Sequence, residues 1–188
     1  MVNFHGITKP VGYRRTWPNL LTQEAVKGHE WYRNNAENPE DHQFVPDPVH
    51  NTILPFNRNV CGPMDCTPVM LDSRARLFIT AAHDIALPVV FQSGLLHYGS
   101  HHEKIRNSPA YPFLKACPAS WDETRLLKGN PAEYVLMARR KADAWFVGGI
   151  TVEAREFHVP LNFLPKDRSY KMHLYRDGED RDDILVES

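Results

Sequence analysis

The spacing of apolar residues changes its period near residue 119, and this change most constrains how the chain can fold. Before that point, apolar residues recur every three or four positions over residues 72–92. Such spacing predicts an amphipathic helix with Asp72 or Ser73 as its N-cap. Pro88 lacks a backbone donor inside this pattern, so we expect the helix to end or kink near Leu87.

After residue 119 apolar and polar residues alternate, as in half-buried strands. The runs Tyr134–Met137 and Trp145–Val147 flank a short polar connection, which predicts a β-hairpin. Alternation over Phe157–Phe163, and again from Tyr170 to Leu174, predicts two more strands. The acidic tail after Gly178 is expected to fray.

These patterns indicate an α/β part at residues 1–118 followed by an antiparallel β-sandwich-like domain at residues 119–188. A complete (β/α)8 barrel needs ~250 residues, more than the first part offers. The first part is therefore either a small open sheet or only the C-terminal part of a (β/α)8 barrel. The predicted fold class is α/β plus β.

Composition and charge exclude several classes of function. Lys and Arg number 22 against 23 Asp and Glu, so the chain has no basic surface for nucleic acid or an anionic membrane. No apolar stretch reaches the ~20 residues that a membrane span needs. The first residues lack the basic and apolar segments of a signal peptide, so none is expected in this chain. The three cysteines show no metal-type spacing and are expected to be free or buried thiols.

Chemically reactive side chains concentrate in the first 30 residues. This stretch contains two carboxylates, Glu24 and Glu30, together with His5, Trp17 and His29. Polar groups at strand ends and in the following loops form the active sites of α/β barrels. Glycosidases use a pair of carboxylates, and Ca²⁺ prefers carboxylate oxygens. By themselves, however, such charges are more typical of solvated loops.

Short motifs then follow one another along nearly the whole chain. The first group comprises His5-Gly6, Lys9-Pro10-Val11-Gly12, Arg15-Thr16-Trp17-Pro18-Asn19 and the two glutamates six residues apart. The later group comprises Pro55-Phe56-Asn57-Arg58, Gly62-Pro63-Met64-Asp65, Ala82-His83, Trp121-Asp122-Glu123-Thr124 and Arg139-Arg140-Lys141. In this order the motifs resemble glycoside hydrolase family 97. Members of that family combine an N-terminal β-sandwich, a catalytic (β/α)8 barrel and a C-terminal β domain, hydrolyse α-glycosides and use Ca²⁺. The resemblance implies that this chain is the end of the barrel plus the C-terminal domain.

The same resemblance implies roles for individual residues. Glu30 matches the general acid and also approaches the metal, Glu24 matches a calcium ligand, and His5 matches a histidine that lines the sugar site. Gly6 stands where inverting members carry a basic glutamate. Retaining members instead use an aspartate nucleophile from an earlier barrel strand, so Gly6 indicates the retaining, α-galactosidase-like branch, with a nucleophile upstream of Met1.

Other candidates have a simpler structural interpretation. The spacing of His97, His101 and His102 would suit a metal, but no carboxylate or thiol motif frames them, so we expect a surface or helix-end role. Asp65 is either a site residue or a turn acid. Cys66 replaces an aromatic residue that is commoner in the family, which leaves sugar contacts near it open. Four aromatic residues of the second part are expected to form its core rather than a sugar-stacking face: Tyr134, Trp145, Phe157 and Tyr170.

The sequence therefore predicts the C-terminal fragment of a retaining exo-α-glycosidase that acts on terminal α-galactosides and is inactive alone. The alternatives are an α-glucosidase of the same family and a non-catalytic carbohydrate-binding or interaction fragment. Expected partners are an oligosaccharide or glycoside substrate and the missing N-terminal portion. Self-association is expected through apolar surface along Val2–Phe4 and Phe78–Val90. The resemblance implies a periplasmic or secreted parent enzyme.

Overall fold

The computed structural model describes residues 1–30, 47–71 and 78–188. Its strands are β1 Val2–Phe4, β2 Leu20–Gln23, β3 Glu123–Asn130, β4 Tyr134–Lys141, β5 Ala144–Thr151, β6 Leu174–Asp177 and β7 Ile184–Glu187. Its α-helices are α1 Tyr13–Thr16, α3 Pro48–Ile53, α4 Ala81–Val90, α5 His102–Asn107 and α6 Tyr111–Ala116, with 3-10 turns at Leu54–Phe56 and Asn59–Cys61. Among the described helices, none is both long and apolar enough to cross a membrane.

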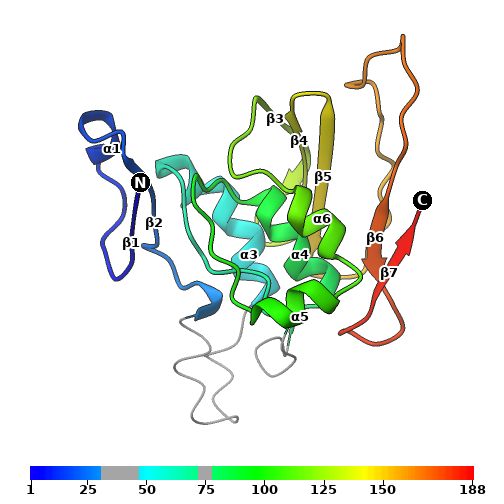
Figure 1. Cartoon of the computed structure of the whole chain (residues 1–188), viewed down its shortest axis with the longest axis horizontal. Helices are drawn as coiled ribbons and strands as arrows, with labels where there is room; N and C mark the ends of the chain where they lie inside the picture. The colour runs from blue at the N-terminus through cyan, green and yellow to red at the C-terminus, as the bar shows by residue number, and fades with distance from the viewer. Residues whose placement is uncertain (31–46, 72–77) are drawn as a thin grey trace.

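Three chain segments pair in parallel in the first part of the molecule. β1 pairs with β2, and Gln23 at the end of β2 forms a parallel bridge with Met64. Figure 1 shows β1, β2 and α1 at one side of the helices. The described residues form no closed barrel, so the assignment of this part to a (β/α)8 barrel stays a prediction.

Helix α4 occupies the middle of the molecule. Its N-cap is Thr80, whose hydroxyl accepts the backbone N–H of His83 at 3.1 Å, whereas the predicted caps Asp72 and Ser73 lie outside the described residues. The expected end near Leu87 is wrong, because the helix continues through Pro88 to Val90. Proline removes only its own donor. The turn survives because the side chains around Pro88 are buried and because the Phe91 N–H still reaches the Leu87 carbonyl at 2.7 Å.

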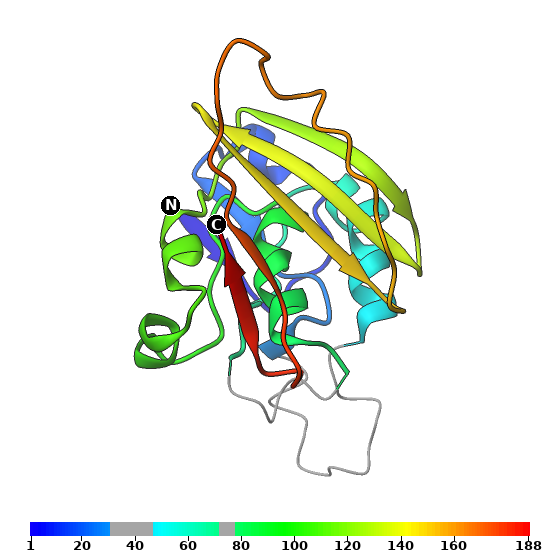
Figure 2. The same cartoon turned by 90° about the vertical axis from the view of Figure 1, so that its right-hand side faces the viewer.

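The predicted hairpin is confirmed, as β4 and β5 pair antiparallel and β3 extends the sheet on the other side of β4. Figure 2 shows this sheet lying across the helices. α4 packs on β5 at Gly148, where a Cβ atom would lie 2.9 Å from the Val89 Cβ and 3.1 Å from the Ala86 carbonyl oxygen. The glycine therefore permits the close approach of helix and strand.

Residues 154–173 contain no strand, so the strand predicted at Phe157–Phe163 is wrong. Instead, the ring of Phe157 packs at a tilt against Tyr134 with ring centroids 5.3 Å apart. The ring of Phe163 packs in the same way against Trp145 at 4.7 Å. Side-chain contacts across the sheet thus replace backbone pairing, and the prolines at positions 160 and 165 have no N–H to offer a ladder. Tyr134, Trp145 and Phe157 are only partly buried and belong to neither described core cluster, and Tyr170 is 40% exposed, so the expectation that these four residues form the core is wrong.

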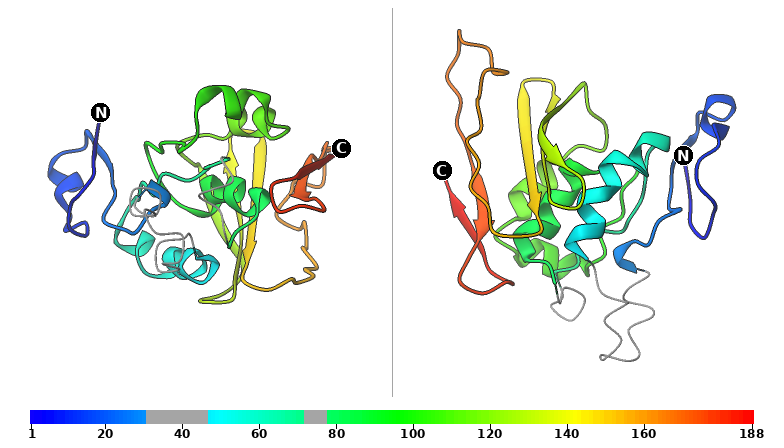
Figure 3. Two further views of the ribbon diagram at one scale, coloured as in Figure 1. Left: turned by 90° about the horizontal axis from the view of Figure 1, so that it is seen from below. Right: turned by 180° about the vertical axis from the view of Figure 1, so that it is seen from behind.

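The chain ends in an antiparallel ribbon of β6 and β7. The predicted strand from Tyr170 begins only at Leu174, and the expectation of a frayed tail is wrong, since β7 forms and Ile184 is buried. The ribbon packs beside α4, where the Ala81 N–H donates to the Arg181 carbonyl at 2.7 Å. Figure 3 shows the ribbon on the opposite side of the helices from β1 and β2.

Both hydrophobic clusters join residues from the two sides of position 119. The first contains Leu54, Met64, Cys66, Leu87, Val90, Phe91, Val135, Met137 and Ile150. The second contains Val69, Ala81, Ile85, Ala110, Leu114 and Ile184. The first cluster therefore forms an interior that the helices share with β4 and β5, and the second joins the helices to the terminal ribbon.

Exposure of apolar surface differs between the two segments expected to be open. Phe4 is 48% exposed and Phe78 50% exposed, as expected. The rest of the second segment is not open, since Ile85, Leu87 and Val89 are buried under β4, β5 and the terminal ribbon. The open apolar surface instead continues from Phe4 to Tyr13 and Trp17, which line a cavity of about 350 Å³.

Candidate active site

The carboxyl ends of the three parallel segments lie side by side. His5 follows β1, Glu24 follows β2, and Asp65 follows the bridge residue Met64. The Glu24 N–H donates to the Phe4 carbonyl at 2.8 Å, and the Asp65 N–H donates to the Gln23 carbonyl at 3.3 Å. Barrel enzymes build their active sites at this end of their strands.

A buried arginine fixes the loop that follows β2. The guanidinium of Arg58 donates to the backbone carbonyls of Gln23 at 2.8 Å, Glu24 at 3.1 Å and Ala25 at 3.1 Å. Burial lowers the pKa of Arg58. These bonds satisfy the carbonyls of Glu24 and Ala25, add to the Asp65 N–H at the carbonyl of Gln23, and hold the backbone of Glu24 in place.

The loop that carries Glu30 is fixed to the neighbouring chain segment. A Cβ atom at Gly28 would lie 2.6 Å from the Cys66 carbonyl oxygen, so only glycine permits this approach. The His29 N–H donates to the same oxygen at 2.9 Å, and the Glu30 N–H donates to the Thr67 hydroxyl at 2.9 Å. The Cys66 side chain is 2% exposed and belongs to the core, which leaves it unable to contact a sugar.

His5, Glu24 and Glu30, the three residues with predicted roles, meet at one point. His5 Nδ1 lies 3.7 Å from Glu24 Oε1 and 3.4 Å from Glu30 Oε2. The second oxygen of Glu24 accepts the Gly6 N–H at 2.7 Å. The Glu30 side chain is 46% exposed, so it is open to a ligand.

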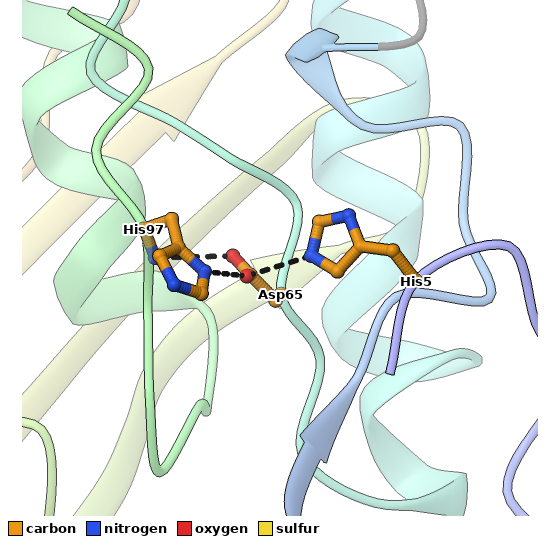
Figure 4. A group of neighbouring side chains, drawn as sticks. All are labelled: His5, Asp65 and His97. Carbon is orange, nitrogen blue, oxygen red and sulfur yellow. Dashed lines mark hydrogen bonds and ion pairs between the residues drawn. The ribbon is translucent and has the colours of Figure 1, made fainter. Parts of the chain in front are cut away.

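Asp65 lies between His5 and His97 (Figure 4), and its side chain is completely buried. Its Oδ2 lies 3.0 Å from His5 Nε2, 2.5 Å from His97 Nδ1 and 2.5 Å from Asn3 Nδ2. Its Oδ1 accepts the backbone N–H groups of Thr67 and His97, each at 3.2 Å. A buried carboxylate needs such donors, and here five of them surround it.

The pKa values of these groups shift because of this network. Burial alone would raise the pKa of Asp65. Hydrogen bonds from His97, His5 and the Thr67 backbone lower this pKa by more than burial raises it, so the net shift is downward. Burial lowers the pKa of His5, but the hydrogen bond and charge of Asp65 and the charges of Glu24 and Glu30 raise it, and the net shift is upward. The cluster therefore combines anionic carboxylates with a histidine that readily accepts a proton.

The structure separates the three histidines considered together in the sequence. His97 joins the cluster through Asp65, so the expected surface or helix-end role is wrong for this residue. His101 and His102 stay outside it, with ring centroids 4.3 Å apart at the start of α5. The position of Asp65 in the sequence could have indicated the role of His97. An acid directly after a parallel strand can contact side chains that follow the neighbouring strands.

The side chains of His5, Glu24 and Glu30 offer some of the ligand atoms that a calcium ion requires. His5, Glu24 and Glu30 offer ligand atoms within 4.8 Å of one another. Two carboxylates beside each other fit a hard cation, which takes 6–8 oxygen ligands. The described residues therefore fit part of a calcium site, with Glu24 and Glu30 as the oxygen donors.

The chain is similar to several proteins of one glycoside hydrolase family. Residues 120–187 match the family model described as glycosyl-hydrolase 97 C-terminal, oligomerisation. A probable retaining α-galactosidase from Streptomyces bingchenggensis is 37% identical over 183 residues, which cover 96% of this chain and 27% of that protein. A retaining α-galactosidase from Bacteroides thetaiotaomicron is 33% identical over 95% of this chain and 28% of that protein.

A solved family 97 enzyme from a Pseudoalteromonas species, in complex with panose, has the same fold. It is 26% identical with a TM-score of 0.84, over 98% of this chain and 30% of that enzyme. The chain thus spans less than a third of the length of each of these relatives. It belongs to glycoside hydrolase family 97 and corresponds to the C-terminal portion of its members.

Proposed function

We propose that this chain forms part of a retaining exo-α-glycosidase that removes terminal α-galactosyl groups. The observation that carries the proposal is the position of Glu30, an exposed carboxylate beside His5 and Glu24 at the carboxyl ends of parallel strands. The similarity to a probable retaining α-galactosidase and to a retaining α-galactosidase supports retention of configuration and galactose as the sugar. The nucleophilic carboxylate and a complete sugar site would come from the portion of the relatives that this chain does not span.

The chemistry assigned to Glu30 has two steps. In the first, Glu30 donates its proton to the oxygen of the departing group while a carboxylate attacks the anomeric carbon. In the second, ionised Glu30 takes a proton from water, which releases the sugar with its original configuration. In this scheme His5 would line the sugar site beside Glu30, and Asp65 holds the His5 ring in place.

Gly6 supports the retaining assignment, because no carboxylate extends from this position. Its φ is +61°, and a Cβ atom there would meet no atom within 4 Å among the described residues. Crowding by those residues therefore does not explain the glycine, whereas the left-handed backbone at this position favours it. A retaining enzyme needs no base at this point of the site.

The experiment replaces Glu30 in the complete enzyme. We expect Glu30→Gln to slow hydrolysis of α-galactosides with poor leaving groups by about 10²-fold or more, since these need protonation. Substrates with acidic phenols should keep a fast first step and accumulate the glycosyl-enzyme. Azide, which needs no deprotonation, should restore turnover and give the α-glycosyl azide. A β-configured first product from the wild-type enzyme would show inversion and overturn the proposal.

We also propose that Glu24 and Glu30 contribute to a calcium site in the complete enzyme, and that this enzyme is periplasmic or secreted. Calcium would supply positive charge close to the reacting sugar. The oligomerisation named for the matching family model supports self-association of the C-terminal region.

An α-glucosidase is the second candidate, because the similar Pseudoalteromonas structure is a complex with panose. Comparing kcat/KM for aryl α-galactosides and aryl α-glucosides separates the two. Absence of both activities in the complete enzyme would favour a non-catalytic carbohydrate-binding protein.

A further inference from the structure

His97 lies at the site because its chain segment runs beside the parallel strands. The Met64 N–H donates to the Gln92 carbonyl at 2.8 Å, and the Ser93 hydroxyl donates to the Thr22 hydroxyl at 3.1 Å. Further along, the Gly99 N–H donates to the Pro68 carbonyl at 2.8 Å. These bonds on both sides of His97 place it next to the end of the Met64 segment.

Asp65 holds His97 at two points. One carboxylate oxygen accepts the backbone N–H of His97 and the other faces Nδ1 of its ring. A ring held through its own backbone and one nitrogen has a single orientation. The His97 side chain is nevertheless 54% exposed, so its outer edge is open.

The contacts with Asp65 determine which ring nitrogen of each histidine carries a hydrogen. An ionised carboxylate only accepts hydrogen bonds, so the ring nitrogens that face Asp65 carry the hydrogens. For a neutral His97 ring, this makes Nε2 the free acceptor. His5 turns its second nitrogen, Nδ1, toward the carboxylates of Glu24 and Glu30, so Nε2 of His97 is the ring nitrogen of the pair that faces no described carboxylate.

The two rings lie edge to face, with centroids 6.0 Å apart and planes at 75°. The open acceptor of His97 can therefore meet a hydroxyl group of a ring-shaped ligand from a different direction than the His5 ring does. Sites that hydrogen-bond a hydroxyl group discriminate strongly against analogues that lack it.

We propose that His97 is a sugar-binding residue that accepts a hydrogen bond from one hydroxyl group of the sugar held beside Glu30, and that Asp65 is the positioning residue for both imidazoles. This inference rests on the proposed function. It assigns to His97 a share of the choice of sugar, which neither its motif nor its position in the sequence indicates.

The test measures galactose binding by calorimetry, and kcat and KM for aryl α-galactosides, with the complete enzyme and its His97→Ala variant. Removing one neutral hydrogen bond should weaken galactose binding about five- to tenfold. His101→Ala is the matched control, since His101 is similarly exposed and lies outside the cluster. We expect it to bind galactose as the wild type does.

Monodeoxy galactosides separate a sugar contact from a structural effect. One deoxy position should weaken binding to the wild type about five- to tenfold but cause no further loss in His97→Ala, because the contact is already absent. If each deoxy sugar loses as much with the variant as with the wild type, the inference is wrong. A wild-type enzyme that binds galactose but cleaves no glycoside overturns the proposed function alone, and one that binds no galactose overturns both.

Asp65→Asn tests the positioning role, with the melting temperature measured alongside. We expect the selectivity among deoxy sugars to fall at the positions read by both His5 and His97, which a general loss of stability would not produce. His97→Ala decides the sugar contact even where Asp65→Asn does not fold. Stoichiometric Zn²⁺ binding that His97→Ala abolishes would identify the cluster as a metal site and overturn the inference.

Discussion

At the scale of single residues, the structure shows how far short motifs can lead. His5, Glu24 and Glu30 were expected to share a site, and the fold brings their ligand atoms within 4.8 Å of one another. Their roles in catalysis and metal binding stay predictions. His97 was not found, because it is 32 residues from Asp65 and its partner is defined only by the pairing of distant segments. Spacing along the chain carries no information about such a contact.

Buried His83 gives a prediction about pH. Burial lowers the pKa of His83 to about 4 against an ordinary value of 6.5, and its Nε2 lies 3.1 Å from Nδ2 of Asn51. Between these values the unfolded chain binds a proton that the folded chain does not. The free energy of unfolding should therefore decrease as pH falls from about 6.5 to about 4, by on the order of 3 kcal/mol from this residue.

The measurement is urea denaturation between pH 7 and pH 4 for the wild type and His83→Gln. Glutamine retains a partner for Asn51 but does not titrate, so its stability should depend less on pH across this window. The depressed pKa of Asp65 acts in a lower range, below the ordinary pKa of aspartate. Identical slopes for the two proteins would contradict the assignment.

At the scale of elements, the spacing of apolar residues predicted the elements whose structure depends mainly on their own sequence. The hairpin of β4 and β5 and the helix before it follow from alternation and three-to-four spacing. The failures at Phe157–Phe163 and in the C-terminal tail have another cause. Alternation sorts side chains to two faces, but whether the backbone also pairs depends on which strand edge lies nearby. The segment Phe157–Phe163 contacts the sheet through its aromatic side chains and forms no strand. In the C-terminal tail, β7 forms because it pairs with the edge of β6.

Adjacent glycines in β5 test the packing of helix on sheet. A Cβ atom at Gly148 would meet the Val89 Cβ at 2.9 Å and a helix carbonyl at 3.1 Å, whereas one at Gly149 would meet only the tip of Leu136 at 3.1 Å. We expect Gly148→Ala to lower the free energy of unfolding by about 2 kcal/mol, because the helix must shift. Gly149→Ala should cost clearly less. Equal losses in chemical denaturation would show that this contact is not limiting.

At the scale of the whole molecule, the proposed calcium site would need ligands from outside this chain. Two carboxylates are a minority of the 6–8 ligands that calcium takes, so the protein alone should bind Ca²⁺ more weakly than micromolar. Titration calorimetry measures this directly, with Glu24→Gln as the variant expected to remove the remaining affinity. Micromolar or tighter binding by the 188-residue protein would mean that the site is complete within it.

The shared interior also bears on how such an enzyme can evolve. The matching family model starts at residue 120, yet Met137 and Ile150 pack in one cluster with Leu87 and Phe91. Recombination at this point would pair a sheet from one ancestor with helices from another, and the two surfaces would have to match at once. The two parts are therefore expected to be inherited together and to accumulate compensating substitutions across their contact. Recombination events that leave a stable protein are expected to have their crossover points away from residue 120.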